Sequence, residues 1–103
     1  MKREIRKRIQ EDLLAQLERS GHYGEYYLDL ISHYMELVDI KEKLQADIRK
    51  NGLRMDALNG NGVLTTKSNE SVERLVKVSG QMLKILSELG LKTPREVIEK
   101  EDL

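Results

Sequence analysis

The sequence predicts a mainly α-helical fold, in which a long antiparallel helical hairpin carries an N-terminal helix, a small β-hairpin connector and a short C-terminal helix. Two observations favour this class. Charged residues make up 35% of the 103 residues and proline occurs once, a composition that suits long exposed helices better than strands. Apolar residues also recur at spacings of three and four over most of the chain, which is the helical period. A chain of this length forms one domain, residues 1–103.

The N-terminal segment, residues 1–20, is predicted to be a basic helix. Its apolar residues recur every fourth position and form one narrow stripe, made of Ile5, Ile9, Leu13 and Leu17. Gly21 follows the stripe and suits the left-handed conformation that commonly ends a helix.

The next segment, residues 22–51, is predicted to be the longest helix. Its apolar seam alternates steps of three and four and is interrupted only at Lys41; the seam consists of Tyr23, Tyr27, Leu30, Tyr34, Leu37, Leu44 and Ile48. Such a helix is roughly 40 Å long, which exceeds the dimensions of a compact globule of this size. We therefore expect these seven residues to form a core or an oligomer interface, with partner chains covering part of the helix.

Residues 53–68 lack the helical period and are predicted to form a β-hairpin. The turn signal is Asn59-Gly60-Asn61-Gly62, which lies between two short apolar runs. A two-stranded ribbon is only marginally stable alone, so we expect it to lie on a helix or on another subunit. Because this connector is short, the helices on either side of it should fold back as an antiparallel pair.

Residues 69–89 are predicted to form the second long helix of the pair. Asn69 or Ser68 is suited to cap its N-terminus, and Gly90 is suited to end it. The sequence Thr93-Pro94-Arg95-Glu96 is a capping box with proline at the first helical position. It predicts a short C-terminal helix over residues 93–101.

Positive charge is concentrated in two clusters although 18 Lys and Arg balance 18 Asp and Glu. Positive charge at a helix N-terminus opposes the helix dipole, and the sequence shows no structural compensation for it. The N-terminal cluster is therefore either a phosphate contact or a solvated end. Both clusters would share a face if the first helix folded back beside the second cluster. The predicted DNA-binding residues are Lys2, Arg3, Arg6, Lys7 and Arg8 in the first cluster, and Lys43, Arg49, Lys50 and Arg54 in the second.

The sequence offers no catalytic apparatus, and we predict no enzyme activity, no cofactor and no metal. There is no cysteine and no phosphate-binding loop. The best metal candidate is the helical stripe Glu25, Asp29, His33 and Glu36, which is more simply interpreted as a solvated acidic face. No signal peptide or membrane span is found, so a cytoplasmic location without membrane partners is expected.

Over about residues 10–98 the chain resembles the phage terminase small subunit family. The resemblance rests on the order and spacing of four stretches, which are LLAQLERSG, YYLDLISHYMELVDIKEKLQADIRKNG, TTKSN and RLVKVSGQMLKILSELGLKTPRE. It implies a non-enzymatic adaptor that assembles as a homo-oligomeric ring and binds viral double-stranded DNA in the host cytoplasm. It also implies that the adaptor regulates the terminase large subunit, which holds the ATPase and nuclease chemistry.

Two other functions compete with this one. A small helical DNA-binding regulator of mobile-element origin would need a helix-turn-helix, which LGLKTPREVIE superficially provides. Its second helix would be acidic and repelled by phosphate, because it carries Glu96, Glu99, Glu101 and Asp102. A metal-dependent enzyme built on the acidic stripe is the third possibility.

Overall fold

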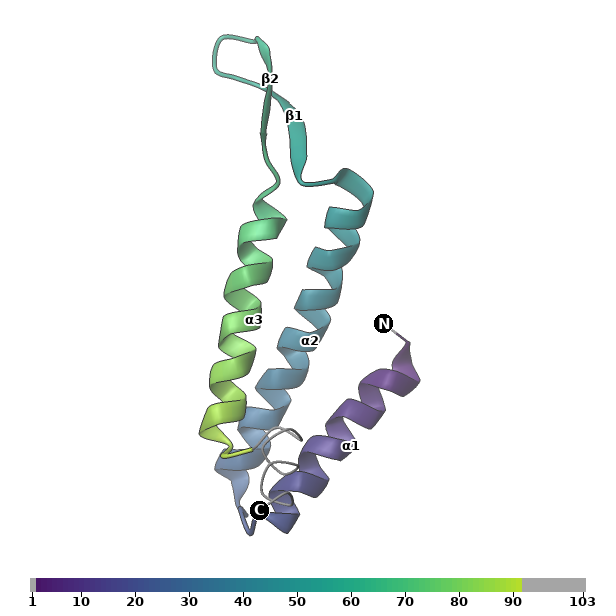
Figure 1. Cartoon of the computed structure of the whole chain (residues 1–103), viewed down its shortest axis with the longest axis vertical. Helices are drawn as coiled ribbons and strands as arrows, with labels where there is room; N and C mark the ends of the chain where they lie inside the picture. The colour runs from purple at the N-terminus through teal and green to yellow at the C-terminus, as the bar shows by residue number, and fades with distance from the viewer. Residues whose placement is uncertain (1, 92–103) are drawn as a thin grey trace, which may run out of the picture.

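The computed structural model describes residues 2–91, which form a helical rod with a β-ribbon at one end (Figure 1). In chain order the elements are α1 (Arg3–Arg19), α2 (Glu25–Asn51), β1 (Arg54–Leu58), β2 (Leu64–Ser68) and α3 (Glu70–Glu88). Helices α2 and α3 run antiparallel side by side, and α1 packs on the other side of α2. The predicted fold class is therefore confirmed. The short helix expected over residues 93–101 lies outside the described residues.

The rod is much longer than a compact domain of the same length. Its extents are 60 × 33 × 24 Å, and its radius of gyration is 18.5 Å. A compact chain of this length would have a radius of gyration of about 13 Å. Most side chains therefore lie close to the surface, and the core is a thin layer between helices.

Helix α2 begins at Glu25, three residues later than the predicted start of this helix at residue 22. The reason is Gly24, whose φ of 119° is a backbone conformation that glycine tolerates and that a helix does not contain. Tyr23 consequently lies in the connector between α1 and α2, with 72% of its surface exposed. Its hydroxyl group donates a hydrogen bond to the Glu18 carbonyl oxygen at 3.4 Å.

The core lies where α2 contacts both of its neighbours. Its buried residues are Leu13, Leu17, Ile31, Met35, Leu37, Val38, Met82, Ile85 and Leu89. Because α2 has a helix on each side, it needs two apolar stripes, and the second one contains Ile31, Met35 and Val38. The N-terminal half of α1 diverges from α2, and Ile5 is accordingly 46% exposed.

Most of the predicted seam of α2 is used inside the chain. Leu37 is buried, and Tyr27, Leu30 and Tyr34 pack against the core. The last two seam residues, Leu44 and Ile48, are half-buried. The seam is thus largely covered by the chain's own helices, and Tyr23 is the exception.

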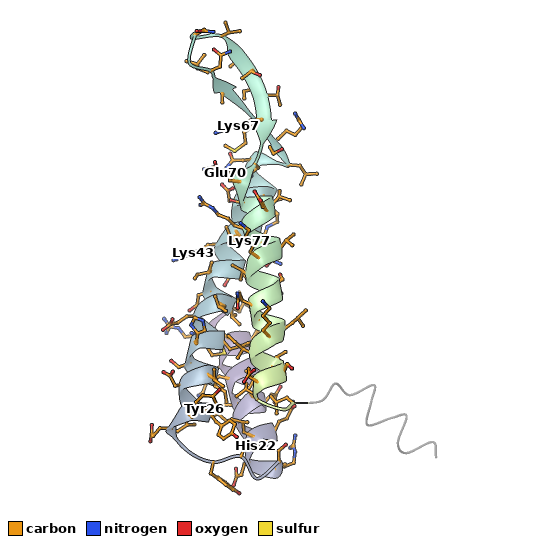
Figure 2. All side chains as sticks on the ribbon, turned by 90° about the vertical axis from the view of Figure 1, so that its left-hand side faces the viewer. His22, Tyr26, Lys43, Lys67, Glu70 and Lys77 are labelled. Carbon is orange, nitrogen blue, oxygen red and sulfur yellow. The ribbon has the colours of Figure 1, made fainter. Side chains whose placement is uncertain are left out.

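The β-ribbon projects beyond the ends of α2 and α3 and does not lie on a helix of the described chain (Figures 1 and 2). Its strands pair antiparallel from Arg54 opposite Ser68 to Leu58 opposite Leu64. The turn is held by the Asn59 side chain, whose Oδ1 accepts hydrogen bonds from the backbone N–H groups of Asn61 at 2.8 Å and Val63 at 3.1 Å. Every residue of β2 is exposed.

A hydrogen-bond network around Asp47 joins the end of α2 to the start of α3. Asp47 Oδ2 accepts from Ser71 Oγ at 2.6 Å and from Asn69 Nδ2 at 3.1 Å. Asp47 Oδ1 accepts from Asn51 Nδ2 at 2.7 Å. Donation by Ser71, followed by Asn69 and Asn51, lowers the pKa of the Asp47 carboxyl below its ordinary value.

Asn69 is the central member of this network and is only 3% exposed. It caps α3, because its Oδ1 accepts from the Ser71 backbone N–H at 3.0 Å, and it is thus the one of the two predicted candidates, Asn69 and Ser68, that takes this role. Its Nδ2 also donates to the Gly52 carbonyl oxygen at 2.9 Å. One buried amide therefore satisfies groups from the end of α2, the connector and the start of α3.

Replacing this amide should destabilise the fold. Asn69→Ala removes a helix cap and leaves the Gly52 carbonyl without its donor, so we expect the free energy of unfolding to fall by about 2 kcal/mol. Urea unfolding followed by circular dichroism measures the change. Asn61→Ala, in the exposed turn, is the matched control and should change the free energy by less than about 0.5 kcal/mol. Equal effects of the two substitutions would contradict the role given to Asn69.

Candidate nucleic-acid interface

Arg6, in the N-terminal basic cluster, forms a bidentate ion pair with Asp39 on α2. Its Nε lies 2.7 Å from Asp39 Oδ1, and its Nη2 lies 3.0 Å from Asp39 Oδ2. The hydrogen bonds from Arg6 lower the pKa of Asp39 below its usual value, and Asp39 raises the pKa of Arg6 in turn. Arg6 therefore has the structural compensation that the sequence did not reveal. The sequence feature that could have indicated this pair is Asp39, a carboxylate between the apolar residues Val38 and Ile40 that would need a cationic partner.

The other basic residues of this cluster point into solvent. Lys2, Arg3, Lys7 and Arg8 are exposed. Lys7 Nζ lies 4.0 Å from Glu11 Oε1, but both side chains are well exposed, and such a surface pair contributes little. These four side chains are spread around the N-terminal part of α1, together with the exposed Glu4 and Glu11, and no residue within 2–91 buries them.

The second basic cluster divides into two parts in the structure. Lys43 is one turn beyond Asp39 on α2 and contributes to lowering the pKa of Asp39, after the larger effect of Arg6. Arg49, Lys50 and Arg54 lie beyond it, where α2 gives way to the ribbon. Because Arg49 follows Asp39 by ten residues, the two are separated by about 15 Å along the helix. The fold of α1 thus brings Lys43 to the N-terminal cluster and leaves the other three residues at the ribbon end.

Charge is separated along the long axis of the rod. The ribbon end carries Arg49, Lys50, Arg54 and Lys67 beside the carboxylates Asp56 and Glu70, whereas the opposite end, at the connector between α1 and α2, carries Glu18, Glu25, Asp29 and Glu88 beside Arg19. Figure 2 shows Lys67 on the ribbon, with His22 and Tyr26 at the other end. Sequence reasoning did not select Lys67, because no periodic pattern marks an exposed position in a two-stranded ribbon. The excess of carboxylates at the connector end makes the ribbon end the less unfavourable of the two for a polyanion.

The acidic stripe considered as a metal site remains a set of solvated side chains. His33 Nδ1 lies 3.8 Å from Glu36 Oε2, and both side chains are more than half exposed. Within residues 2–91, no three histidine or carboxylate side chains are grouped closely enough to hold a metal ion.

An open apolar hollow lies at the connector between α1 and α2. It has a volume of about 250 Å³, and its lining includes Leu14, His22, Tyr23 and Leu28. The His22 ring contacts the Tyr27 ring in a tilted arrangement, with centroids 5.1 Å apart. This hollow lies at the acidic end of the rod and contributes nothing to the basic surface.

None of the helices described between residues 2 and 91 combines the length and the hydropathy that crossing a membrane requires.

Comparison with known proteins gives one informative result. A family model described as "Phage terminase, small subunit" matches residues 7–97, which is most of the chain. Neither the curated proteins nor the solved structures contain a significant match. The matched range includes α1 from Lys7 onward, α2, the ribbon and α3.

The ion pair between Arg6 and Asp39 should make stability depend on pH. Because the pKa of Asp39 is lower in the folded chain than in the unfolded chain, the pair stabilises the fold fully above about pH 5. That contribution is lost as the pH falls below about 4 and the carboxyl group is protonated. Asp39→Asn should therefore lower the urea midpoint at neutral pH and have a much smaller effect near pH 3.

Asp29→Asn is the matched control, because Asp29 is exposed on the same helix and makes no ion pair within residues 2–91. Its effect on the urea midpoint should be small at both pH values. An Asp39→Asn effect of equal size at neutral and acidic pH would contradict the proposed stabilisation by Arg6.

Proposed function

The chain belongs to the phage terminase small subunit family, and on this premise we propose that it is a non-catalytic adaptor for phage DNA packaging. In this role it binds viral double-stranded DNA, assembles with copies of itself and regulates the large terminase subunit. The ATPase and nuclease chemistry belongs to that large subunit. The observation that carries the proposal is the family match over residues 7–97 together with the exposed basic residues at the N-terminus of α1 and at the ribbon end.

DNA binding is supported by cations that the fold leaves available. Lys2, Arg3 and Arg8 are exposed and make no ion pair within residues 2–91, and Lys7 makes only a weak surface pair. Each contact between such a side chain and a phosphate releases a condensed counterion, which favours binding at low salt. In an assembly of several chains these contacts add, so a few per chain are sufficient for useful affinity.

Self-association is supported by apolar residues that the chain does not cover. Val76 and Leu83 are 70% and 68% exposed and lie seven residues apart, on the same side of α3. Between them lies Gly80, where an added Cβ would meet open space, so another helix could approach closely. Other exposed apolar side chains include Tyr23 in the connector and Tyr26, Leu28 and Ile40 on α2. We propose that copies pack against these surfaces, with a ring as the closed form of a head-to-tail contact.

Of the interface predicted from the sequence, Tyr23 keeps this role in the proposal. The other six residues are Tyr27, Leu30, Tyr34, Leu37, Leu44 and Ile48, and they are buried or half-buried within one chain. The proposed contact therefore uses surfaces other than the α2 seam. The main surface added to the predicted interface is the exposed side of α3, with Val76 and Leu83.

Removing exposed positive charge from α1 should weaken DNA binding. We expect Arg3→Ala/Arg8→Ala to reduce affinity for a labelled duplex and to make the plot of log K against log salt shallower by up to about 2, because two phosphate contacts are lost. Fluorescence anisotropy between about 50 and 200 mM salt measures both quantities. Arg19→Ala/Lys84→Ala removes the same charge elsewhere and should leave the slope unchanged. An unchanged slope in the α1 variant would exclude this cluster from the interface.

Charging the exposed side of α3 should disrupt assembly without unfolding the chain. Light scattering should show the parent protein as an oligomer larger than a dimer, and Val76→Glu/Leu83→Glu as a smaller species with the same circular dichroism spectrum. The control Gln81→Glu/Lys84→Glu alters other exposed positions of α3 and should preserve assembly. A parent protein that is monomeric at tens of micromolar would contradict the adaptor proposal, and a simple dimer would favour the DNA-binding regulator instead.

A further inference from the structure

We propose that the β1–β2 ribbon enters the major groove of double-stranded DNA and reads base sequence with one of its two faces. The inference rests on the proposed function, because it requires that the chain binds DNA, and it assigns the sequence-reading role to a defined element. The reading face consists of Arg54, Asp56, Leu58, Leu64, Thr66 and Ser68.

The strand register defines this face. Arg54 lies opposite Ser68, Asp56 opposite Thr66 and Leu58 opposite Leu64. Because side chains alternate along a strand, these three pairs point to the same side of the ribbon. The other side carries Met55 and Ala57 opposite Lys67 and Thr65. In β1 the residues of the proposed reading face are exposed, whereas Met55 and Ala57 are half-buried.

The ribbon has the size and position for insertion into a groove. The major groove is about 12 Å wide and admits a two-stranded antiparallel ribbon. Strands of five residues extend about 17 Å, enough to follow several base pairs. Figures 1 and 2 show the ribbon projecting from the end of the helix pair, so that the helices of the same chain would not block its approach.

The side chains of the reading face match the chemistry of base edges. Arginine donates two hydrogen bonds to guanine, aspartate accepts from the amino group of cytosine, and serine and threonine bond to either kind of edge. Arg54, Asp56, Thr66 and Ser68 supply these groups without a competing hydrogen bond from another side chain in residues 2–91. Leu58 and Leu64, at the turn end, are 71% and 67% exposed and suit contact with thymine methyl groups.

The charge around the ribbon favours nucleic acid over a protein partner. Among residues 49–68, the cations are Arg49, Lys50, Arg54 and Lys67, against the carboxylate of Asp56; Asp47 and Glu70 lie just outside these bounds, on the helices. A protein bound through the apolar tip would bury Leu58 and Leu64 and leave this excess of positive charge unused. Arg49 and Lys50 lie in the last turn of α2, at the base of the ribbon, where they would reach phosphates beside the occupied groove.

The ribbon is also joined firmly to the helices. The Asn69 backbone N–H donates to the Leu53 carbonyl oxygen at 2.8 Å, directly below the strand pair. The Asn69 side chain then bonds to Gly52 and Asp47 on the α2 side. This arrangement fixes the direction in which the ribbon leaves the rod, so DNA binding would cost little entropy for orienting the ribbon.

The test uses adjacent threonines on opposite faces. The full-length protein first selects duplexes from a random-sequence pool, and anisotropy then measures its affinity for an enriched duplex and for a scrambled duplex of the same composition. Thr66→Ala, on the reading face, should reduce the ratio of the two affinities at least fivefold and leave binding to the scrambled duplex unchanged. Thr65→Ala, the same chemical change on the other face, should leave both affinities unchanged.

Each outcome has a defined meaning. Failure to bind any duplex would contradict the proposed function itself. Binding without an enriched sequence, or equal specificity ratios for Thr66→Ala and Thr65→Ala, would overturn the assignment of the ribbon while leaving DNA binding intact. If Leu58→Ala/Leu64→Ala reduced oligomer size or binding of the large subunit but left the specificity ratio unchanged, the ribbon would be a protein contact and the inference would be wrong. Circular dichroism of each variant confirms that the fold is retained.

Discussion

The arrangement of the rod depends on the carboxylate of Asp47. It accepts hydrogen bonds from Ser71, Asn69 and Asn51, and so joins the last turns of α2 to the first turn of α3. A connector that reverses the chain must satisfy the free carbonyl groups at one helix end and the free N–H groups at the other. Here one carboxylate and one buried amide bring the two ends together, and the apolar faces of α2 and α3 then meet along their length. The ribbon inherits its direction from the same junction.

The N-terminal helix illustrates how one basic cluster serves two purposes. Arg6 holds α1 against α2 through Asp39, while its neighbours Arg3 and Arg8 remain in solvent. The ion pair is partly exposed, so its main contribution is geometric, since it sets where the diverging half of α1 lies. In the adaptor proposal, that position determines where the remaining positive charges are presented to a phosphate backbone.

The sequence predicted the three helices of residues 2–91 and the ribbon, and it named Asn69 as one of two candidate caps, because each depends on local spacing and on residues close together in the chain. It did not predict the late start of α2, because the conformation of Gly24 is not visible in an apolar pattern. The pairing of Arg6 with Asp39 joins residues 33 positions apart, and only the packing of α1 brings them together. The basic residues other than Lys67 were selected because they cluster along the chain, and their contact with DNA remains a prediction.

Within residues 2–91 no further strand pairs with the two outer edges of the ribbon, and this affects how the protein behaves in concentrated solution. Unpaired edges next to exposed leucines are a common starting point for strand-to-strand aggregation. Here each strand has only five residues, and Arg54, Asp56 and Lys67 interrupt the apolar surface. Charged residues and short strands are the features by which natural sheets discourage such pairing. The positive charges that suit the ribbon to nucleic acid therefore also discourage aggregation of free copies through their ribbon edges.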